Sequence, residues 1–197
     1  MKQASETRDL RSLIESVQAG QPVEYVLFWG HRPPKDGGVS AACFSQWYDA
    51  SFQVGKETFR TAEHFMMAGK AELFGDLALR QQILEAKTPD LAKQLGRKVA
   101  GFDERRWAEH RFDIVVAANM GKFGGNGALR RFHLSTGDQV LVEASPVDPV
   151  WGIGLAANDA DARHPARWKG LNLLGFALME VRAQLKAAKE ATVHPTL

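Results

Sequence analysis

The fold of this 197-residue chain is decided by two short stretches, TAEHFMMAGK at residues 61–70 and VEASPVDPVWGIG at residues 142–154. In the first stretch, Thr61 has the residue type of a helix N-cap, which places Glu63 in the first turn of a helix over about residues 62–74. The second stretch is bounded by prolines and glycines, which favour a tight loop. Together they predict a helix and a loop that each present a carboxylate.

Helix signals predominate on both sides of these stretches. Apolar residues recur at helical spacing in residues 7–19, and the remaining helices are predicted from start and stop residues. One of these helices begins at Thr88-Pro89-Asp90 and ends near Gly96. A second begins at Asp103 and ends at Gly124-Gly125. A third has Asn172 as its N-cap. Strand signals cover residues 25–29, a β-rich stretch from Phe44 to Phe59, and residues 139–142.

These elements predict an α+β fold, a single compact, helix-dominated domain with a few short β-strands. We expect an N-terminal helical extension over residues 1–22, the main domain over residues 23–187 and a C-terminal tail over residues 188–197. A chain of this length is most simply one domain.

Composition excludes several classes of protein. The formal net charge of +2 is too small to argue for nucleic-acid binding by itself, although a local basic cleft is compatible with it. Cys43 is the only cysteine, so the chain has no internal disulfide and no cysteine-based metal site. The six histidines show no metal-ligand spacing, and no apolar run approaches the length of a membrane span. We therefore expect no metal, no cofactor, no membrane association and a cytoplasmic location.

Two acids are the first candidates for chemistry. Glu63, Met67 and Lys70 share one helix face, although a glutamate in a first turn also complements the helix dipole. Asp148 either faces a pocket from its rigid loop or bonds only to its own backbone, as turn aspartates often do. Glu143 ends the preceding strand, where it either supports a site or is solvated.

Candidate binding residues are less well defined. Trp107, on the long helix, and Trp151, in the loop, either stack on a planar ligand or pack in the core. Three segments are candidates for binding an anion, and nothing in the sequence favours one of them: Arg32 in the glycine-rich loop of residues 31–38, Arg97-Lys98, and the helix start at Lys169–Asn172.

The motifs of the chain, in the order in which they follow one another, resemble those of the NADAR family. The resemblance covers residues 27–185 and is carried by these segments: Phe44-Ser45-Gln46-Trp47, residues 61–65, Lys70, Leu95-Gly96-Arg97, Trp107, residues 118–123, residues 141–143 through Asp148 to Trp151-Gly152, residues 170–175 and residues 178–182. It implies that Glu63, Trp107 and Asp148 are functional. Gln46 departs from the F-S-N-F pattern of other members, which we expect to affect what the pocket accepts.

The resemblance also implies an activity. It is hydrolysis of the N-glycosidic bond between a phosphoribosyl group and an aminopyrimidine of riboflavin biosynthesis, which releases ribose 5-phosphate. Glu63 and Asp148 would divide the roles of acid and of water-positioning or cation-stabilising group. In a second scheme, Lys70 attacks C1 of a ring-opened aminoribose and forms a Schiff base.

Two other functions remain open from the sequence. The first, also implied by the family, is removal of ADP-ribose from guanine bases of nucleic acid, which is the same bond cleavage on a larger substrate. The second is a non-catalytic module that binds ADP-ribose or NAD. The presence of Glu63 and Asp148 together argues against the second, since a pure binder of anionic phosphates has little need of two carboxylates.

Overall fold

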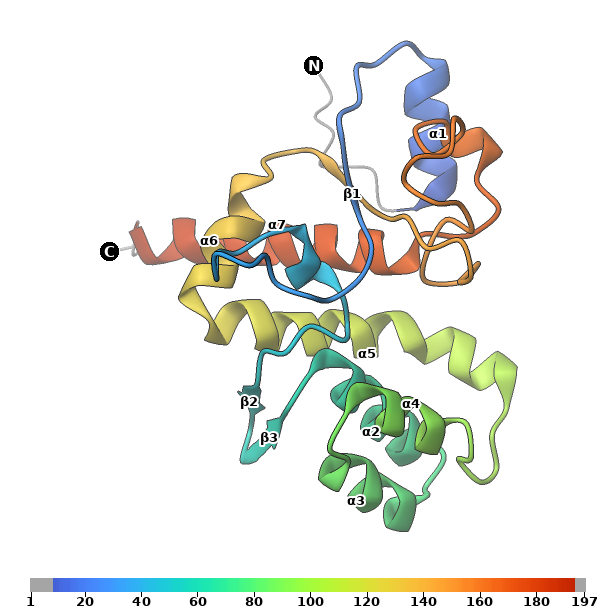
Figure 1. Ribbon diagram of the computed structural model, residues 1–197, viewed down its shortest axis with the longest axis vertical. Helices are drawn as coiled ribbons and strands as arrows, with labels where there is room; N and C mark the ends of the chain where they lie inside the picture. Colours follow the sequence, from blue (N-terminus) through green and yellow to red (C-terminus); the bar gives the residue numbers. More distant parts are fainter. Residues whose placement is uncertain (1–8, 194–197) are drawn as a thin grey trace.

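The computed structural model describes residues 9–193 and has the α+β architecture expected from the sequence, with helices predominating (Figure 1). The helices are α1 (Leu10–Gln18), α2 (Ala62–Leu73), α3 (Leu77–Glu85), α4 (Pro89–Gly96), α5 (Glu104–Gly125), α6 (Gly127–Ser135) and α7 (Leu173–Val193), with 3-10 turns η2 (Ala41–Phe44) and η3 (Pro165–Arg167). The strands are β1 (Tyr25–Phe28), β2 (Phe52–Val54), β3 (Glu57–Phe59) and β4 (Val140–Glu143).

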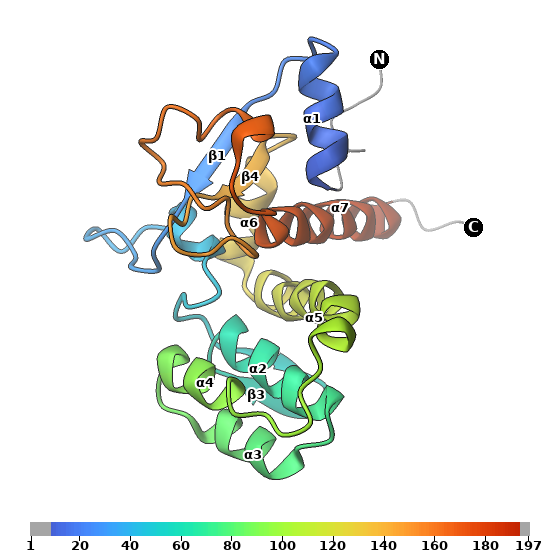
Figure 2. The same cartoon turned by 90° about the vertical axis from the view of Figure 1, so that its right-hand side faces the viewer.

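Helix α5 runs through the middle of the molecule and contacts both α7 and α2 (Figures 1 and 2). On one side of it lie α7 and the β1–β4 pair. On the other side lie α2, α3, α4 and the β2–β3 hairpin. The side chains that meet between the two sides come from segments far apart in the sequence.

The two pairs of strands serve different purposes. Strands β1 and β4 are parallel, in a register that runs from Tyr25 opposite Val140 to Phe28 opposite Glu143. The first three residues of β4 are buried against α7, so the strand delivers Glu143 to the edge of the core. Strands β2 and β3 form a short antiparallel hairpin that contacts α5.

Three of the predicted helix starts are confirmed by their capping bonds. The side chain of Thr61 accepts a hydrogen bond from the backbone N–H of His64 (3.4 Å), and Thr88 accepts one from Leu91 (3.2 Å). Asp103 caps α5 by accepting from the N–H of Arg106 at 2.7 Å. Each cap satisfies a backbone donor that the first turn of a helix leaves unpaired.

Other expectations were wrong in detail. The segment from Phe44 to Trp47 is not strand, because η2 and the turn that follows it wind this part of the chain against the core. The prediction missed α3 and α6. Asn172 stands just before α7 but does not cap it with its side chain, which bonds to the backbone of β4 instead.

The ends of the described chain add two facts to the expected boundaries. Helix α1 contacts η3 and buries Leu13 completely, so the N-terminal helix packs on the domain. Helix α7 continues to Val193, past the tail boundary expected at residue 187. Residues 1–8 of the expected extension and 194–197 of the expected tail lie outside the described residues. None of the helices between residues 9 and 193 has the length and hydropathy that crossing a membrane requires.

Candidate active site

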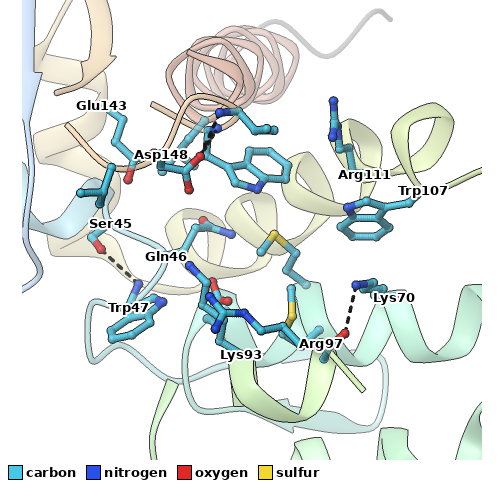
Figure 3. A pocket seen from close by; sticks show the side chains of 18 of the residues that line it. Ser45, Gln46, Trp47, Lys70, Lys93, Arg97, Trp107, Arg111, Glu143 and Asp148 are labelled. Carbon is cyan, nitrogen blue, oxygen red and sulfur yellow. Dashed lines mark hydrogen bonds between the residues drawn. The ribbon is translucent and has the colours of Figure 1, made fainter. Parts of the chain in front are cut away.

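A cavity of about 430 Å³ lies where α2, α4 and α5 face the loop that follows β4 (Figure 3). It takes side chains from four separate parts of the chain. They are Ser45, Gln46 and Trp47; Glu63, Met66, Met67 and Lys70; Lys93, Gly96, Arg97, Phe102, Glu104, Trp107 and Arg111; and Glu143, Val147, Asp148, Val150, Trp151 and Leu174. In Figure 3, Glu143 and Asp148 lie on one side of this cavity, and Lys93 and Arg97 lie opposite them.

Glu63 enters the cavity from the first turn of α2 and is only 2% exposed. Burial raises the pKa of its carboxyl from 4.5 to about 7, and the charge of Asp148 adds to this effect. Lys93, the indole of Trp47 and Arg97 act in the opposite direction. A carboxyl with a pKa near neutrality can exchange protons readily at physiological pH.

Glu143, at the end of β4, is a second acid, partly buried and with its Oε2 shielded from solvent. Burial, followed by the charges of Asp148 and Glu63, raises its pKa from 4.5 to about 8, while Lys93 acts in the opposite direction. Its backbone N–H donates to Oδ1 of Asn172 at 3.0 Å, which fixes the strand end. The sequence left this residue between a supporting and a solvated role, and the structure excludes the solvated one.

Asp148 both bonds to the backbone of its own turn and lies at the cavity, the two possibilities that the sequence left open. Its Oδ1 accepts hydrogen bonds from the backbone N–H groups of Val150 (2.9 Å) and Trp151 (2.8 Å), as in an aspartate-stabilised turn. The same carboxylate forms part of the cavity wall beside Glu143 (Figure 3). The turn therefore holds the acid in a fixed orientation at the cavity.

Lys70 and Trp107 meet at the other end of the cavity. The Nζ of Lys70 donates to the backbone oxygen of Gly96 at 3.0 Å. It lies 4.0 Å from the centre of the Phe102 ring and 5.6 Å from that of Trp107. Burial lowers the pKa of Lys70, and the charge of Glu104 partly opposes this. An amine with a lowered pKa is more often neutral, and therefore more nucleophilic, than a solvated lysine.

Further cations line the cavity from α4 and α5. Lys93 and Arg97 are one helical turn apart on α4, and Lys93 Nζ lies 5.7 Å from the Trp47 ring. Arg111 of α5 contacts Glu104 at 3.4 Å. Lys93 and Arg111 were not predicted as site residues, because charged residues on helices usually face solvent. For Lys93, the available signal was its i, i+4 spacing to Arg97.

The structure brings most of the predicted site residues together. Glu63, Asp148, Lys70, Trp107, Trp151 and Gln46 all line the cavity. Arg32 and Asn172 do not line it. Arg32 is exposed in the loop after β1, and Asn172 is fully buried with its amide bonded to the backbone at Leu141 and Glu143.

Several buried polar atoms in the cavity have no hydrogen-bond partner within residues 9–193. They are Nε2 of Gln46, Oε1 of Glu63, Nε of Arg111 and Oε2 of Glu143. Leaving a buried polar atom unpaired costs about 1–3 kcal/mol, so such atoms are uncommon in a folded core. Two donors and two acceptors left unpaired around one cavity indicate a polar ligand. Among the described residues, no group of three or more His, Cys, Asp or Glu side chains is arranged to hold a metal ion.

Comparison with known proteins gives one consistent result. The model of the NADAR domain family matches residues 27–186. The chain is 40% identical to "N-glycosidase R617" of Acanthamoeba polyphaga mimivirus, covering 82% of this chain and 96% of that protein, and 30% identical to "N-glycosidase YbiA" of Escherichia coli, covering 74% and 82%. The NMR structure of the E. coli protein YbiA superposes with a TM-score of 0.68 at 26% identity, over 88% of this chain and 92% of that one.

Proposed function

The chain belongs to the NADAR domain family, and from that premise we propose that it is an N-glycosidase acting on phosphoribosylaminopyrimidine intermediates of riboflavin biosynthesis. Its products are ribose 5-phosphate and a free aminopyrimidine. The names of its relatives support the class of reaction, and the cavity supports a small anionic substrate.

The observation that carries the proposal is that Glu63 and Glu143, which line the same cavity as Asp148, each have one buried carboxyl oxygen without a hydrogen-bond partner among the described residues. Cleavage of an N-glycosidic bond needs a proton for the departing nitrogen and negative charge for the ribosyl carbon. A carboxyl with a pKa of about 7 supplies the first, and the fixed carboxylate of Asp148 supplies the second. No arrangement of this kind is needed for packing.

In the direct route, Glu63 in its protonated form gives its proton to the leaving nitrogen as the C1–N bond breaks. Asp148 stabilises the positive charge that develops at C1 and orients a water molecule. The water oxygen bonds to C1, and its proton passes to a carboxylate of the cavity. The net reaction adds one water across the bond, which gives the free sugar and the free amine.

In a second route, Lys70 acts as a nucleophile. An aminoribose opens to an imine, and the Lys70 amine attacks its C1, expels the aminopyrimidine and leaves an imine on the enzyme. Water then hydrolyses this imine and regenerates the lysine. The lowered pKa of Lys70 and its position on the cavity wall support this route.

The remaining lining residues suit binding. The indole rings of Trp107 and Trp151 offer flat surfaces for a pyrimidine, a contact worth about 1–3 kcal/mol for bases in nucleic-acid complexes. Lys93, Arg97 and Arg111 provide positive charge for the 5-phosphate. Arg111 also contacts Glu104, so Lys93 and Arg97 are the cations more available to the phosphate.

The test is release of free sugar by the purified protein from two substrates side by side. One is the phosphoribosylaminopyrimidine formed early in riboflavin synthesis, and the other is an oligonucleotide with ADP-ribosylated guanine. We expect ribose 5-phosphate from the first substrate. The variant Glu63→Gln keeps the shape of the side chain but cannot give up a proton as the acid does, so we expect kcat to fall by about 10²- to 10⁴-fold while the protein still folds cooperatively.

Two results would contradict the proposal. Release of ADP-ribose from the oligonucleotide alone would assign the protein to reversal of nucleic-acid modification. Binding of either substrate without turnover would make it a non-catalytic module. Turnover by Glu63→Gln at the wild-type rate would show that Glu63 is not the acid of the direct route.

A further inference from the structure

The amide of Gln46 is held in one orientation by a residue behind it. Asn119 of α5 donates from its Nδ2 to the backbone oxygen of Val115 at 2.9 Å and to Oε1 of Gln46 at 2.8 Å. A backbone carbonyl only accepts hydrogen bonds, so the NH₂ side of the Asn119 amide must face Val115. Turning this amide over would bring two carbonyl oxygens together in a buried place, which is unfavourable.

The orientation of Asn119 determines which atom Gln46 presents to the cavity. Because Oε1 of Gln46 accepts from Asn119, its Nε2 is the amide atom that points away from Asn119, on a residue that lines the cavity. Gln46 is 6% exposed, and its Nε2 has no partner among the described residues. The cavity therefore contains a buried, oriented and unused hydrogen-bond donor.

The backbone around Gln46 is held as firmly as its side chain. Lys122, three residues after Asn119 on α5, donates from Nζ to the backbone oxygen of Ser45 at 2.8 Å. The backbone oxygen of Gln46 accepts from the N–H of Glu63 at 3.0 Å, which ties the donor to the helix that carries a proposed catalytic acid. A donor fixed at three points loses little entropy when it binds a ligand.

We infer that Gln46 is a specificity-determining residue, whose Nε2 donates to a ring carbonyl oxygen of the leaving heterocycle and so selects oxo-substituted over amino-substituted rings. The identity of the heterocycle rests on the proposed function. An amide is a neutral donor, which suits a neutral carbonyl, whereas Lys93 and Arg97 are the donors placed for an anion. In Figure 3, Gln46 lies between the acidic side of the cavity and these cations.

An amino group in place of the carbonyl would set a donor against a donor and leave both without a partner. Sites built to bond a particular polar group reject analogues that lack it far more strongly than apolar pockets reject a change of size. One unpaired buried donor corresponds to a loss of about tenfold or more in affinity.

The experiment measures binding of two free bases by calorimetry, triaminopyrimidinone and tetraaminopyrimidine, which differ by an oxo or an amino group at one ring position. We expect the wild-type protein to bind the pyrimidinone about tenfold or more tightly than the tetraamine. Because binding is read without turnover, the result does not depend on whether the protein cleaves its proposed substrate.

Three variants locate the preference. Gln46→Met keeps the volume of the side chain but removes the donor, and we expect it to bind the two bases within about twofold of each other. Asn119→Asp, protonated in its buried place, donates to Val115 and accepts from Gln46, so the Gln46 amide turns and presents its oxygen. The preference should then reverse. Gln53→Met makes the same chemical change at an exposed position of β2 and should behave as wild type.

The outcomes separate this inference from the proposed function. Equal affinity of the wild type for the two bases, tighter binding of the tetraamine, or a preference that persists in Gln46→Met would overturn the role of Gln46. If Asn119→Asp fails to fold, the Gln46→Met comparison decides alone. A confirmed preference together with no sugar release from any phosphoribosylaminopyrimidine would uphold the role of Gln46 and reject the N-glycosidase assignment.

Discussion

At the scale of single residues, the most unusual feature is that Glu63, which is buried, and Glu143, which is partly buried, each have a shielded carboxyl oxygen without a hydrogen-bond partner among the described residues. An ionised carboxylate is unfavourable in such a place, which is why burial raises the pKa of both groups. Packing alone would be better served by apolar side chains of similar volume. We therefore propose that the two acids lower the stability of the fold and are present because the reaction needs them.

The raised pKa of Glu143 has a consequence for stability. Its folded-state pKa of about 8 lies above the ordinary value of 4.5, so between these values the folded protein holds a proton that the unfolded chain releases. The stability it contributes is complete below about pH 4.5 and is lost as the pH rises through 8. We expect the free energy of unfolding of wild type to fall relative to that of Glu143→Gln across this range, as measured by urea denaturation. Parallel pH curves for the two proteins would show that Glu143 does not titrate in this way.

Lys70 allows a direct test of the covalent route. If its amine forms an imine with the ring-opened sugar, borohydride added during turnover will reduce the imine to a stable secondary amine. We expect mass spectrometry to find the sugar phosphate attached to the peptide that contains Lys70. The control is Lys70→Met, which keeps the length of the side chain and has no amine. Turnover without any adduct would leave the direct route as the mechanism.

The cavity residues differ in how well the sequence revealed them. Glu63 and Asp148 stand in motifs with a clear local structure, a capped helix start and a rigid turn, so their positions could be predicted. Lys93 and Arg111 could not, because a charged residue on a helix is solvated in most proteins and only packing against a distant segment makes it part of a site. Glu143 depends in the same way on loop 144–151 folding back beside it.

At the scale of elements, a capping residue alone did not decide which helices were predicted. Thr61, Thr88 and Asp103 each accept a first-turn hydrogen bond, as their positions indicated. Helices α3 and α6 were missed although Asp76 and Asn126 cap them. Neither has the proline at the first helical position that marked the start of α4, and α6 begins with a glycine, which is a poor helix former.

The junction between β4 and α7 depends on Asn172, which has φ of 55° and bonds to the backbone of β4 on both sides of its amide. Asn172→Ala loses both bonds and adds backbone strain, so we expect a loss of about 2–4 kcal/mol in the free energy of unfolding. Asn172→Gly loses the same bonds but tolerates the positive φ, so it should be about 1 kcal/mol more stable than the alanine variant. Chemical denaturation measures both. Equal stability of the two variants would argue that the backbone conformation at this position is not strained.

At the scale of the whole molecule, the cavity joins parts that are otherwise connected mainly through α5. Its acidic loop follows β4, and its cations come from α4 and α5. A ligand that contacts both therefore links the two sides of the molecule. Sequence reasoning could not predict this junction, because no local pattern reports how α4 and the loop after β4 are placed relative to each other.

Binding of the product should stabilise the whole fold. Ribose 5-phosphate at about 100 times its Kd would add about 2.7 kcal/mol to the free energy of unfolding. We expect this gain, measured by denaturation with and without the ligand, to disappear in the double variant Lys93→Ala/Arg97→Ala. Lys98→Ala, next to Arg97 but outside the cavity lining, is the control and should keep the gain. An equal loss in the control would mean that general charge, and not these two residues, attracts the phosphate.

The parallel pairing of β1 and β4 also affects the order in which the chain folds during its synthesis. Strand β1 is made early, but its partner is made only after residues 29–139 have left the ribosome. The contacts of α2 with α3, α4 and α5 join segments that are all translated before β4, so these helices can pack on one another before then. Glu63 therefore lies in an incomplete cavity while β4 and the loop that follows it are still being translated. A parallel pair closes slowly because so much chain must be brought together first. The nascent protein therefore cannot cleave its substrate until its last third has folded. Until then, its apolar β1 strand lacks its partner strand and must be shielded from pairing with other chains.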